Sequence, residues 1–264
     1  DLRLHGRKPG MMKRLLASLK DRTVDVLLME GTHFGLATDN PIGEIDLEEG
    51  IVAHIKQSTG LILASFSPQN VDRLVGFICA AKRTDRMFVA DVYTAFVMHL
   101  IASETKVPHP LRDDDIRVYY PQAFCQSYKH RNRTRFYDQF LPARIDLEQV
   151  RAEPSRYVML FRPSMFAGDF GGRLPERSLC LYSYWSGYLE KTDWKQAKAA
   201  LRSAGGDLLK VHATGHILKD DIVKFVDAVS PGTVIPVHTF EPERFQEHFA
   251  NTQILKDGES WTVI

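Results

Sequence analysis

Several side chains that could bind metal or transfer protons come directly after apolar, strand-like runs. Glu30 ends the run VDVLLME, and His238 ends the run TVIPVH. Asp1 opens the sequence in what resembles the end of a strand, and the segment LLKVHATGH places His216 just before a predicted helix. Because open α/β sheets hold their ligands at the carboxyl ends of strands, these four residues are candidates for one shared site.

A carboxylate that is hydrogen-bonded to an imidazole holds one tautomer of the ring, which suits general acid–base chemistry. Asp1 and His238 are of types that bind zinc or manganese. Taken singly, each residue has an ordinary structural interpretation: a histidine in a loop, Glu30 capping a helix or pairing with a lysine, and Asp1 as a frayed terminus. Their joint occurrence at strand ends favours a functional site.

The elements that must position these residues alternate between strand-like and helical runs, which predicts an α/β fold with parallel strand pairing. Strands are expected at 24–30, 61–66, 87–91, 157–162, 179–184, 208–213, 233–237 and 260–264. Helices are expected at 11–20, 45–59, 68–83, 94–103, 193–204, 219–229 and 242–249. The segment 106–153 has weak periodicity, and only helices are predicted there.

Composition places the chain among ordinary globular proteins. Its 264 residues are 44% hydrophobic and 25% charged, with 17 glycines, which argues against disordered and collagen-like chains. No apolar run is long enough for a membrane helix, and no signal-peptide pattern is present. An odd set of three cysteines cannot form a complete disulfide framework, so a cytoplasmic location is expected. The net charge of +1 points to no class of partner.

The segments DLRLHGRK, LLMEGT, VHATGH and VIPVHTF follow one another in a recognisable order. In this order they resemble the later part of the β-CASP group of metallo-β-lactamase-fold hydrolases, which includes ribonuclease J, the pre-mRNA 3′-end endonuclease and Artemis. The resemblance covers nearly the whole chain, although the middle third matches in layout more than in motif.

The resemblance implies a hydrolase with two divalent metal ions, zinc or manganese. Asp1 matches the aspartate that bridges the two metals, and His238 matches the motif C histidine, a ligand of the second metal. Glu30 matches the motif A acid. His216 matches the motif B histidine, which pairs with that acid and protonates the leaving oxygen.

Other residues would contact the substrate. By the same resemblance, His212 and Thr214 fall where relatives carry a histidine and a serine that line a phosphate pocket, and threonine keeps the hydroxyl. A separate signal comes from the start of the helix expected at 68–83, where Ser67, Asn70 and Arg73 would meet phosphate at the free N–H groups. The alternative for these three is simply a well-capped helix.

A basic run, KHRNRTR at 129–135, lies between Tyr128 and Phe136. It could track a phosphate backbone and stack bases, but a solvated surface helix is the interpretation that the pattern favours. A separate set of aromatic residues, around Ser183 and Gly187, is expected to be mostly core: Tyr182, Tyr184, Trp185 and Tyr188.

The implied organisation is a metallo-β-lactamase fold at 1–43 and 204–264, with a β-CASP-like cap inserted at 44–203. The resemblance implies a phosphodiesterase that acts on RNA, preferred over DNA because motif C ends in histidine as in the RNA-processing members. The alternative is a non-catalytic module that binds nucleic acid or a partner. An unrelated nucleotide-binding protein is disfavoured, because no strand is followed by GxGxxG or GxxxxGK[ST].

The family's HxHxDH motif does not occur in this sequence. Asp1 and His238 alone cannot hold two ions, since zinc sites draw about three or four protein ligands per ion. We therefore expect the chain to be inactive by itself, and to be either part of a longer hydrolase or a natural non-catalytic relative. A complementing N-terminal half, or self-association through the uncovered sheet, is the expected partner, and no membrane is expected.

Overall fold

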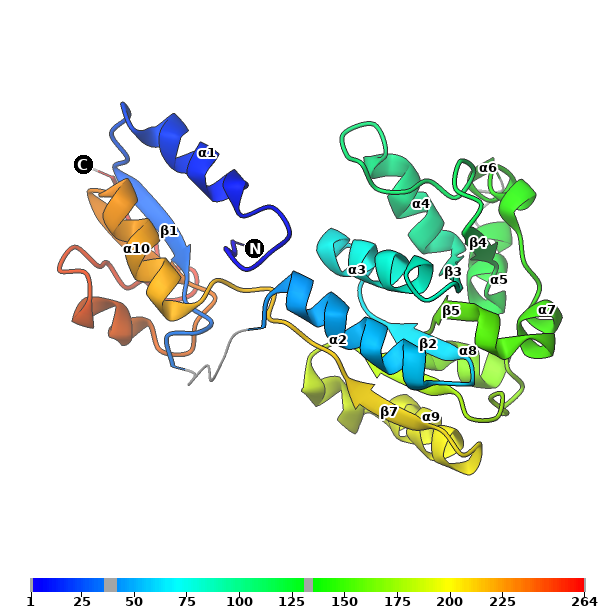
Figure 1. Cartoon of the computed structure of the whole chain (residues 1–264). Coiled ribbons are helices and arrows are strands. Elements are labelled where there is room, and N and C mark those ends of the chain that lie inside the picture. Colours follow the sequence, from blue (N-terminus) through cyan, green and yellow to red (C-terminus); the bar gives the residue numbers. More distant parts are fainter. Residues whose placement is uncertain (1, 36–41, 131–134, 264) are drawn as a thin grey trace. The chain divides into compact units, whose positions relative to one another are not determined.

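The computed structural model describes residues 2–35, 42–130 and 135–263 (Figure 1). The chain divides into two units. The terminal unit combines Asp1–Gly43 with Ala213–Ile264, and the central unit comprises Glu44–His212. Each unit contains its own parallel sheet, and each is described by itself.

The terminal unit is built on a parallel pair of strands, β1 (Val26–Glu30) and β8 (Thr233–Val237). Its helices are α1 (Gly10–Leu19) and α10 (Lys219–Val229), and the 3-10 helix η4 (Pro242–Glu247) follows β8. The pairing register aligns the first residues of the two strands with each other and the last residues with each other. The carboxyl ends of both strands therefore meet at one edge.

The core of the terminal unit joins these elements. Ile222 and Phe225 of α10 are spaced at the helical period and pack with Met29 of β1, Val234 of β8 and Phe245 of η4. All five are buried. This packing holds the strand ends in place for the side chains that follow them.

The central unit contains a six-stranded parallel sheet with the order β4-β3-β5-β2-β6-β7. Its strands are β2 (Ile62–Ser65), β3 (Met87–Asp91), β4 (Ile116–Tyr119), β5 (Tyr157–Leu160), β6 (Leu179–Tyr182) and β7 (Asp207–Lys210). Its α-helices are α2 (Glu44–Gln57), α3 (Val71–Lys82), α4 (Val92–Ile101), α5 (Gln122–His130), α6 (Arg135–Asp138), α7 (Leu147–Ala152), α8 (Pro163–Gly168) and α9 (Thr192–Ser203). Its short 3-10 helices are η1 (Leu141–Ala143), η2 (Pro154–Arg156) and η3 (Ser186–Glu190).

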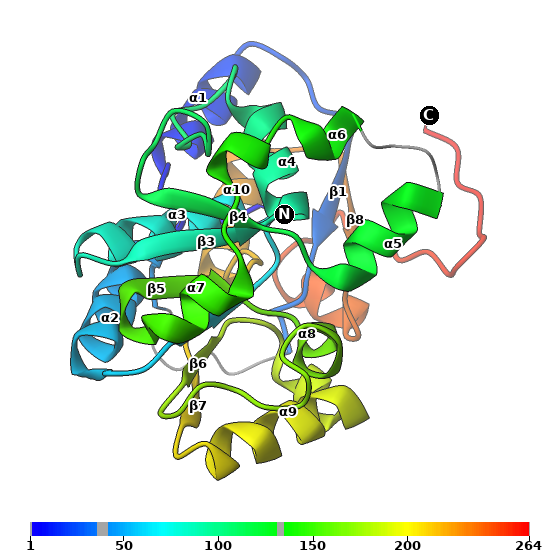
Figure 2. The same ribbon diagram turned by 90° about the vertical axis from the view of Figure 1, so that its right-hand side faces the viewer.

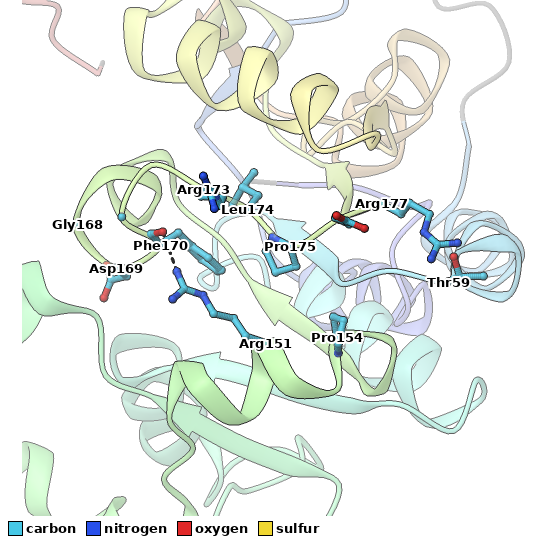
Figure 3. Close-up of a pocket in the computed structure, with 12 residues that line it drawn as sticks. Thr59, Arg151, Pro154, Gly168, Asp169, Phe170, Arg173, Leu174, Pro175 and Arg177 are labelled. Atoms are coloured by element: carbon cyan, nitrogen blue, oxygen red, sulfur yellow. Dashed lines mark hydrogen bonds between the residues drawn. The ribbon is translucent and has the colours of Figure 1, made fainter.

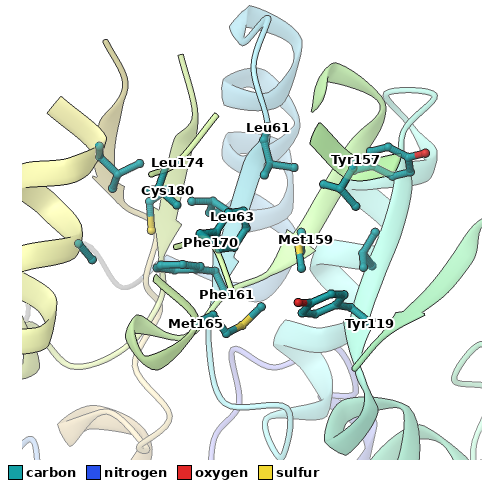
Figure 4. Packing of buried hydrophobic residues seen from close by; sticks show 14 of the residues in the cluster. Leu61, Leu63, Tyr119, Tyr157, Met159, Phe161, Met165, Phe170, Leu174 and Cys180 are labelled. Atoms are coloured by element: carbon teal, nitrogen blue, oxygen red, sulfur yellow. The ribbon is translucent and has the colours of Figure 1, made fainter. Parts of the chain in front are cut away.

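Helices cover both faces of this sheet. Figure 2 shows α2 and α3 on one side of it and α8 and α9 on the other. On the second side, Leu63 of β2 and Met159 of β5 pack with Met165 of α8 and Trp194 of α9 in one buried cluster (Figure 4). Because strand side chains alternate between faces, a sheet covered on both sides needs apolar residues at nearly every strand position, as β2 and β5 have.

The predicted α/β fold with parallel pairing is confirmed, but single elements differ. β4 lies inside 106–153, where only helices were predicted, because four residues that include a charged one make too short a pattern to recognise. The segment 242–249 contains a 3-10 helix, not the expected α-helix. The strand expected at 260–264 is wrong for its described residues, 260–263, which are exposed and form no strand.

The division of the chain also differs from the prediction at one boundary. The segment 204–212 was assigned to the metallo-β-lactamase-fold part, but it contains β7, which pairs along its whole length with β6. Backbone pairing therefore joins this segment to the central unit, which ends at His212. None of the helices within the described ranges combines the length and apolar character needed to span a membrane.

Candidate functional site

The candidate site lies in the terminal unit, at the carboxyl ends of β1 and β8. Glu30 is the last residue of β1 and is aligned with Val237, the last residue of β8. His238 follows directly and so lies beside Glu30. His216 comes from the segment ahead of α10. The parallel register thus brings together three predicted residues that are far apart in the sequence.

Glu30 and His216 form the tightest polar contact of the site. Glu30 Oε2 lies 2.5 Å from His216 Nδ1, and their side chains are 14% and 28% exposed. The other oxygen, Glu30 Oε1, accepts a hydrogen bond from the backbone N–H of Leu2 at 3.2 Å. An ionised carboxylate can accept hydrogen bonds but cannot donate them, so the Nδ1 atom of His216 carries a proton in this contact. The other ring nitrogen, Nε2, is left to face a ligand or substrate.

His238 completes the group. Its ring stacks on that of His216, with centroids 5.0 Å apart and an interplanar angle of 28°. Ligand-capable atoms of Glu30, His216 and His238 all lie within 4.8 Å of one another. His238 is exposed and has a φ of 50°, a left-handed backbone that costs on the order of 1 kcal/mol or more for a residue with a side chain.

Thr32 links two members of the group and was not predicted. Its Oγ1 lies 2.9 Å from His238 Nδ1, 3.3 Å from the His238 carbonyl and 3.4 Å from Glu30 Oε2. If His238 Nδ1–H donates to Thr32, its Nε2 is left with a lone pair, as metal ligation requires. The sequence feature that could have pointed to Thr32 is its hydroxyl, two residues after Glu30 at the end of a strand.

Thr214 was predicted to line a phosphate pocket, but its hydroxyl and its carbonyl already make hydrogen bonds with histidines. Its Oγ1 accepts the backbone N–H of His216 at 3.2 Å and lies 2.8 Å from His33 Nε2. Its carbonyl accepts a hydrogen bond from His5 Nε2 at 2.8 Å. The hydroxyl therefore fixes the chain that leads into His216, and this role explains why threonine serves here.

His33 is 7% exposed, and burial, together with the nearby His216 and His5 rings, lowers its pKa despite the opposing effect of Glu30. A neutral ring suits its place beside Thr214. The Nδ1 atoms of His33 and His5 are buried and have no hydrogen-bond partner among the described residues. Neither histidine belongs to the group of three ligand-capable residues.

His212 is the last residue of the central unit. Its Nδ1 lies 3.2 Å from the backbone oxygen of Ser183. This contact belongs to the end of the six-stranded sheet, where Ser183 follows β6.

Two of the three residues predicted to contact phosphate at this helix start, Asn70 and Arg73, are engaged within the protein. The helix α3 begins at Val71 and not at Pro68, because Asn70 is its N-cap and accepts the Arg73 N–H at 3.1 Å. The backbone carbonyl of Ser67 accepts a hydrogen bond from the Asn70 N–H in the turn before the helix.

Arg73 does not reach solvent. Its guanidinium is paired with both oxygens of Glu44, at 3.0 and 3.1 Å, and both side chains are 1% exposed. It also contacts Ser183 Oγ. Arg73 is therefore a buried ion-pair residue of the central unit, with its charge already neutralised.

Two other predictions lie outside the described residues: Asp1, and the greater part of the basic run at 129–135. Among residues 2–35, 42–130 and 135–263, no second group of three ligand-capable side chains occurs. Two imidazoles and a carboxylate are of the ligand types that zinc and manganese bind, but Glu30 Oε2 and His216 Nδ1 contact each other, which leaves His238 as the member of the group most open to a metal ion. The same set is too small for two ions.

Comparisons with known proteins bear on the fold. No family model and no curated protein matches this chain. It is similar to a crystal structure of a protein of unknown function from Enterococcus faecalis V583, with a TM-score of 0.72 and 18% identity. The match covers 98% of this chain and 56% of that chain, so this chain spans little more than half of its length. At this identity the similarity shows a shared fold alone.

Proposed function

We propose that this chain carries the acid–base part of a metal-dependent phosphodiesterase site. The observation that supports it is the contact between Glu30 Oε2 and His216 Nδ1, at 2.5 Å, with the His238 ring stacked alongside. The proposal places the chain in a metallo-β-lactamase fold of the β-CASP type, with RNA as substrate, as the sequence resemblance implies.

In this proposal the two residues of the contact divide the work. Glu30 holds the His216 ring by Nδ1 and would stabilise the doubly protonated ring, which can then give the proton on Nε2 to the departing 3′ oxygen and return to the neutral Nδ1–H form. The N–H of Leu2 and the hydroxyl of Thr214 fix the two partners from either side. The proton donor is thus positioned before substrate arrives.

His238 would hold a metal ion, and the resemblance implies that Asp1 shares it. A bound metal would supply a hydroxide nucleophile at neutral pH and stabilise charge on the attacked phosphate. A two-metal site needs more ligands than the described residues offer, and these would have to come from further protein residues.

The test is an RNA cleavage assay on the full-length protein, with zinc or manganese added and with chelator as the control. We expect cleavage that chelator stops and that the substitution His216→Ala abolishes, while RNA binding persists. RNA binding that weakens steeply with salt, with no cleavage under either metal, would instead support a non-catalytic binding module.

A further inference from the structure

The central sheet has a point where the direction of its connections reverses, between the neighbouring strands β2 and β5. After β2 the chain passes through α3 to β3, and after β5 it passes through α8 to β6, on the other side of β2. Figure 2 shows α3 and α8 on opposite sides of the sheet. In open α/β sheets ligands bind in the crevice that such a reversal leaves at the carboxyl ends of the strands.

A pocket of about 200 Å³ lies at this point. It is lined by Ser65 at the end of β2 and by Phe161 and Arg162 directly after β5. Tyr184 and Tyr188, from the segment after β6, also line it. The pocket therefore combines a guanidinium with aromatic walls where the topology predicts a ligand.

Arg162 is held firmly and keeps donors to spare. Its Nε donates to Asp91 Oδ2 at 2.8 Å, and the Asp91 side chain is fully buried. Its guanidinium carbon lies 5.7 Å from the ring centre of Tyr93 and 5.6 Å from that of Phe124. The Arg162 side chain is 23% exposed, and its Nη2, which is itself buried, has no hydrogen-bond partner among the described residues.

Of the aromatic set that was expected to be mostly core, Tyr182 is buried and Tyr184 packs against the same core cluster, whereas the two residues beside the pocket mouth are exposed. Trp185 is 68% and Tyr188 is 42% exposed, and their rings meet edge to face at 5.6 Å. Gly187 lets the Trp185 ring lie against the backbone, because a Cβ there would collide with it. Exposed aromatic rings that are held in place are suited to stacking on a planar ligand.

The charges around the pocket balance. Asp91 neutralises Arg162, and Lys191 and Asp193 in the lining have opposite signs. A pocket without net charge does not select free anions. Its volume is below the range of about 300–1,000 Å³ that whole drug-sized ligands need, and it suits a single ring system.

We propose that this pocket binds an unpaired guanine base of RNA. Guanine presents O6 and N7 to a guanidinium such as Arg162. A carboxylate such as Asp193 can accept from its N1–H and N2–H, and the base would stack on the face of Tyr188 opposite Lys191, whose Nζ lies 4.7 Å from the Tyr188 ring centre. Single-stranded RNA is recognised in this manner, through splayed bases stacked on aromatic rings and hydrogen-bonded at their edges. The proposal rests on the proposed function only for RNA as the source of the base.

A larger pocket in the same unit, of about 840 Å³, is a weaker candidate. Figure 3 shows its lining, which includes Arg151, Arg173 and Arg177. Thr59, Pro154 and Arg177 precede β2, β5 and β6, so this pocket lies at the amino ends of the strands. Arg151 already donates to the Phe170 carbonyl at 2.7 Å.

The test measures binding of guanosine 5′-monophosphate to the full chain by calorimetry, with no metal added. Ribose 5-phosphate carries the same sugar and phosphate without the base and is the matched ligand. We expect saturable binding of the nucleotide and none of ribose 5-phosphate. Equal binding of both would overturn the proposal in favour of a phosphate site, and no binding of the nucleotide would overturn it outright.

Variants locate the binding. Tyr188→Ala should weaken nucleotide binding by about fivefold or more, and Tyr188→Phe should not, because the ring is kept. Arg162→Lys keeps the charge, loses the planar fork and should also weaken binding. Phe240→Ala removes an exposed aromatic of the terminal unit and is the control. Unchanged affinity in Tyr188→Ala, with the unfolding midpoint unchanged, would overturn the assignment. Because no metal is present, these results are independent of whether RNA is cleaved.

Discussion

Glu30 and His216 are 186 positions apart in the sequence, and their side chains meet at 2.5 Å. One end of this contact is the last residue of β1, and the other lies three positions before the first residue of α10. The contact selects one tautomer of His216 and leaves Nε2 as the nitrogen that can act on a substrate.

Substitutions of the two stacked histidines should separate proton transfer from metal binding. His216→Ala should reduce turnover by about 10²–10⁴-fold and leave metal content intact, because it removes the proton donor. His238→Ala should lose metal. Elemental mass spectrometry and RNA cleavage on the same full-length preparations check both. Equal loss of metal in the two variants would show that the division of roles is wrong.

The negative charge of Glu30 should contribute to turnover in addition to the hydrogen bond that orients His216. Glu30→Gln can still accept the His216 N–H through its amide oxygen, but it cannot stabilise a protonated ring. We expect turnover between that of the unchanged protein and that of His216→Ala, with metal content unaltered. Turnover equal to that of the unchanged protein would mean that Glu30 only orients the ring.

Thr32 should control how well His238 binds metal. Thr32→Val is nearly isosteric but removes the oxygen that contacts His238 Nδ1, and metal affinity should fall by about 10–100-fold. Thr32→Ser keeps the oxygen and is the matched control. The measurement is a zinc titration against a competing chelator. Equal affinities of the two variants would exclude a role for the hydroxyl.

The buried pair of Arg73 and Glu44 should be structural. Arg73→Met leaves the 1%-exposed Glu44 carboxylate without its partner and should destabilise the fold by about 3–5 kcal/mol. The double substitution Arg73→Met with Glu44→Leu should recover most of the loss, because no buried charge remains. Urea unfolding of the three proteins gives the comparison. If Arg73→Met were as stable as the unchanged protein, the structural role of the Arg73–Glu44 ion pair would be wrong.

His33 should make stability depend on pH. Its pKa is lowered from 6.5 in the folded protein, so below about pH 6.5 the unfolded chain binds the proton that the folded chain resists. The free energy of unfolding should therefore fall as pH is lowered through about 6.5 toward the folded pKa, and His33 should add no pH dependence above it.

His33→Gln should flatten this part of the stability curve, as measured by urea unfolding between pH 5 and 8. His54→Gln, a histidine of the central unit, is the matched control. A slope unchanged by His33→Gln would mean that other groups carry the effect.

The sequence alone determined much of the local structure. It predicted β3, β8 and α10 with the bounds that the structure has, because each is a strongly patterned run with clear turn signals on either side. It also placed Glu30 and His238 at strand ends, because strand ends follow directly from such runs. It missed β4, whose four residues show no pattern apart from their pairing with β3.

Only the tertiary structure decided which of these residues meet. The parallel register of β1 and β8 puts Glu30 beside His238, and packing of α10 brings His216 onto Glu30. The same kind of contact turned Arg73 inward to Glu44 and engaged Thr214 with His33. Residue patterns report the period of local burial, whereas these contacts join residues from distant segments. They depend on strand register and on packing, which no local pattern contains.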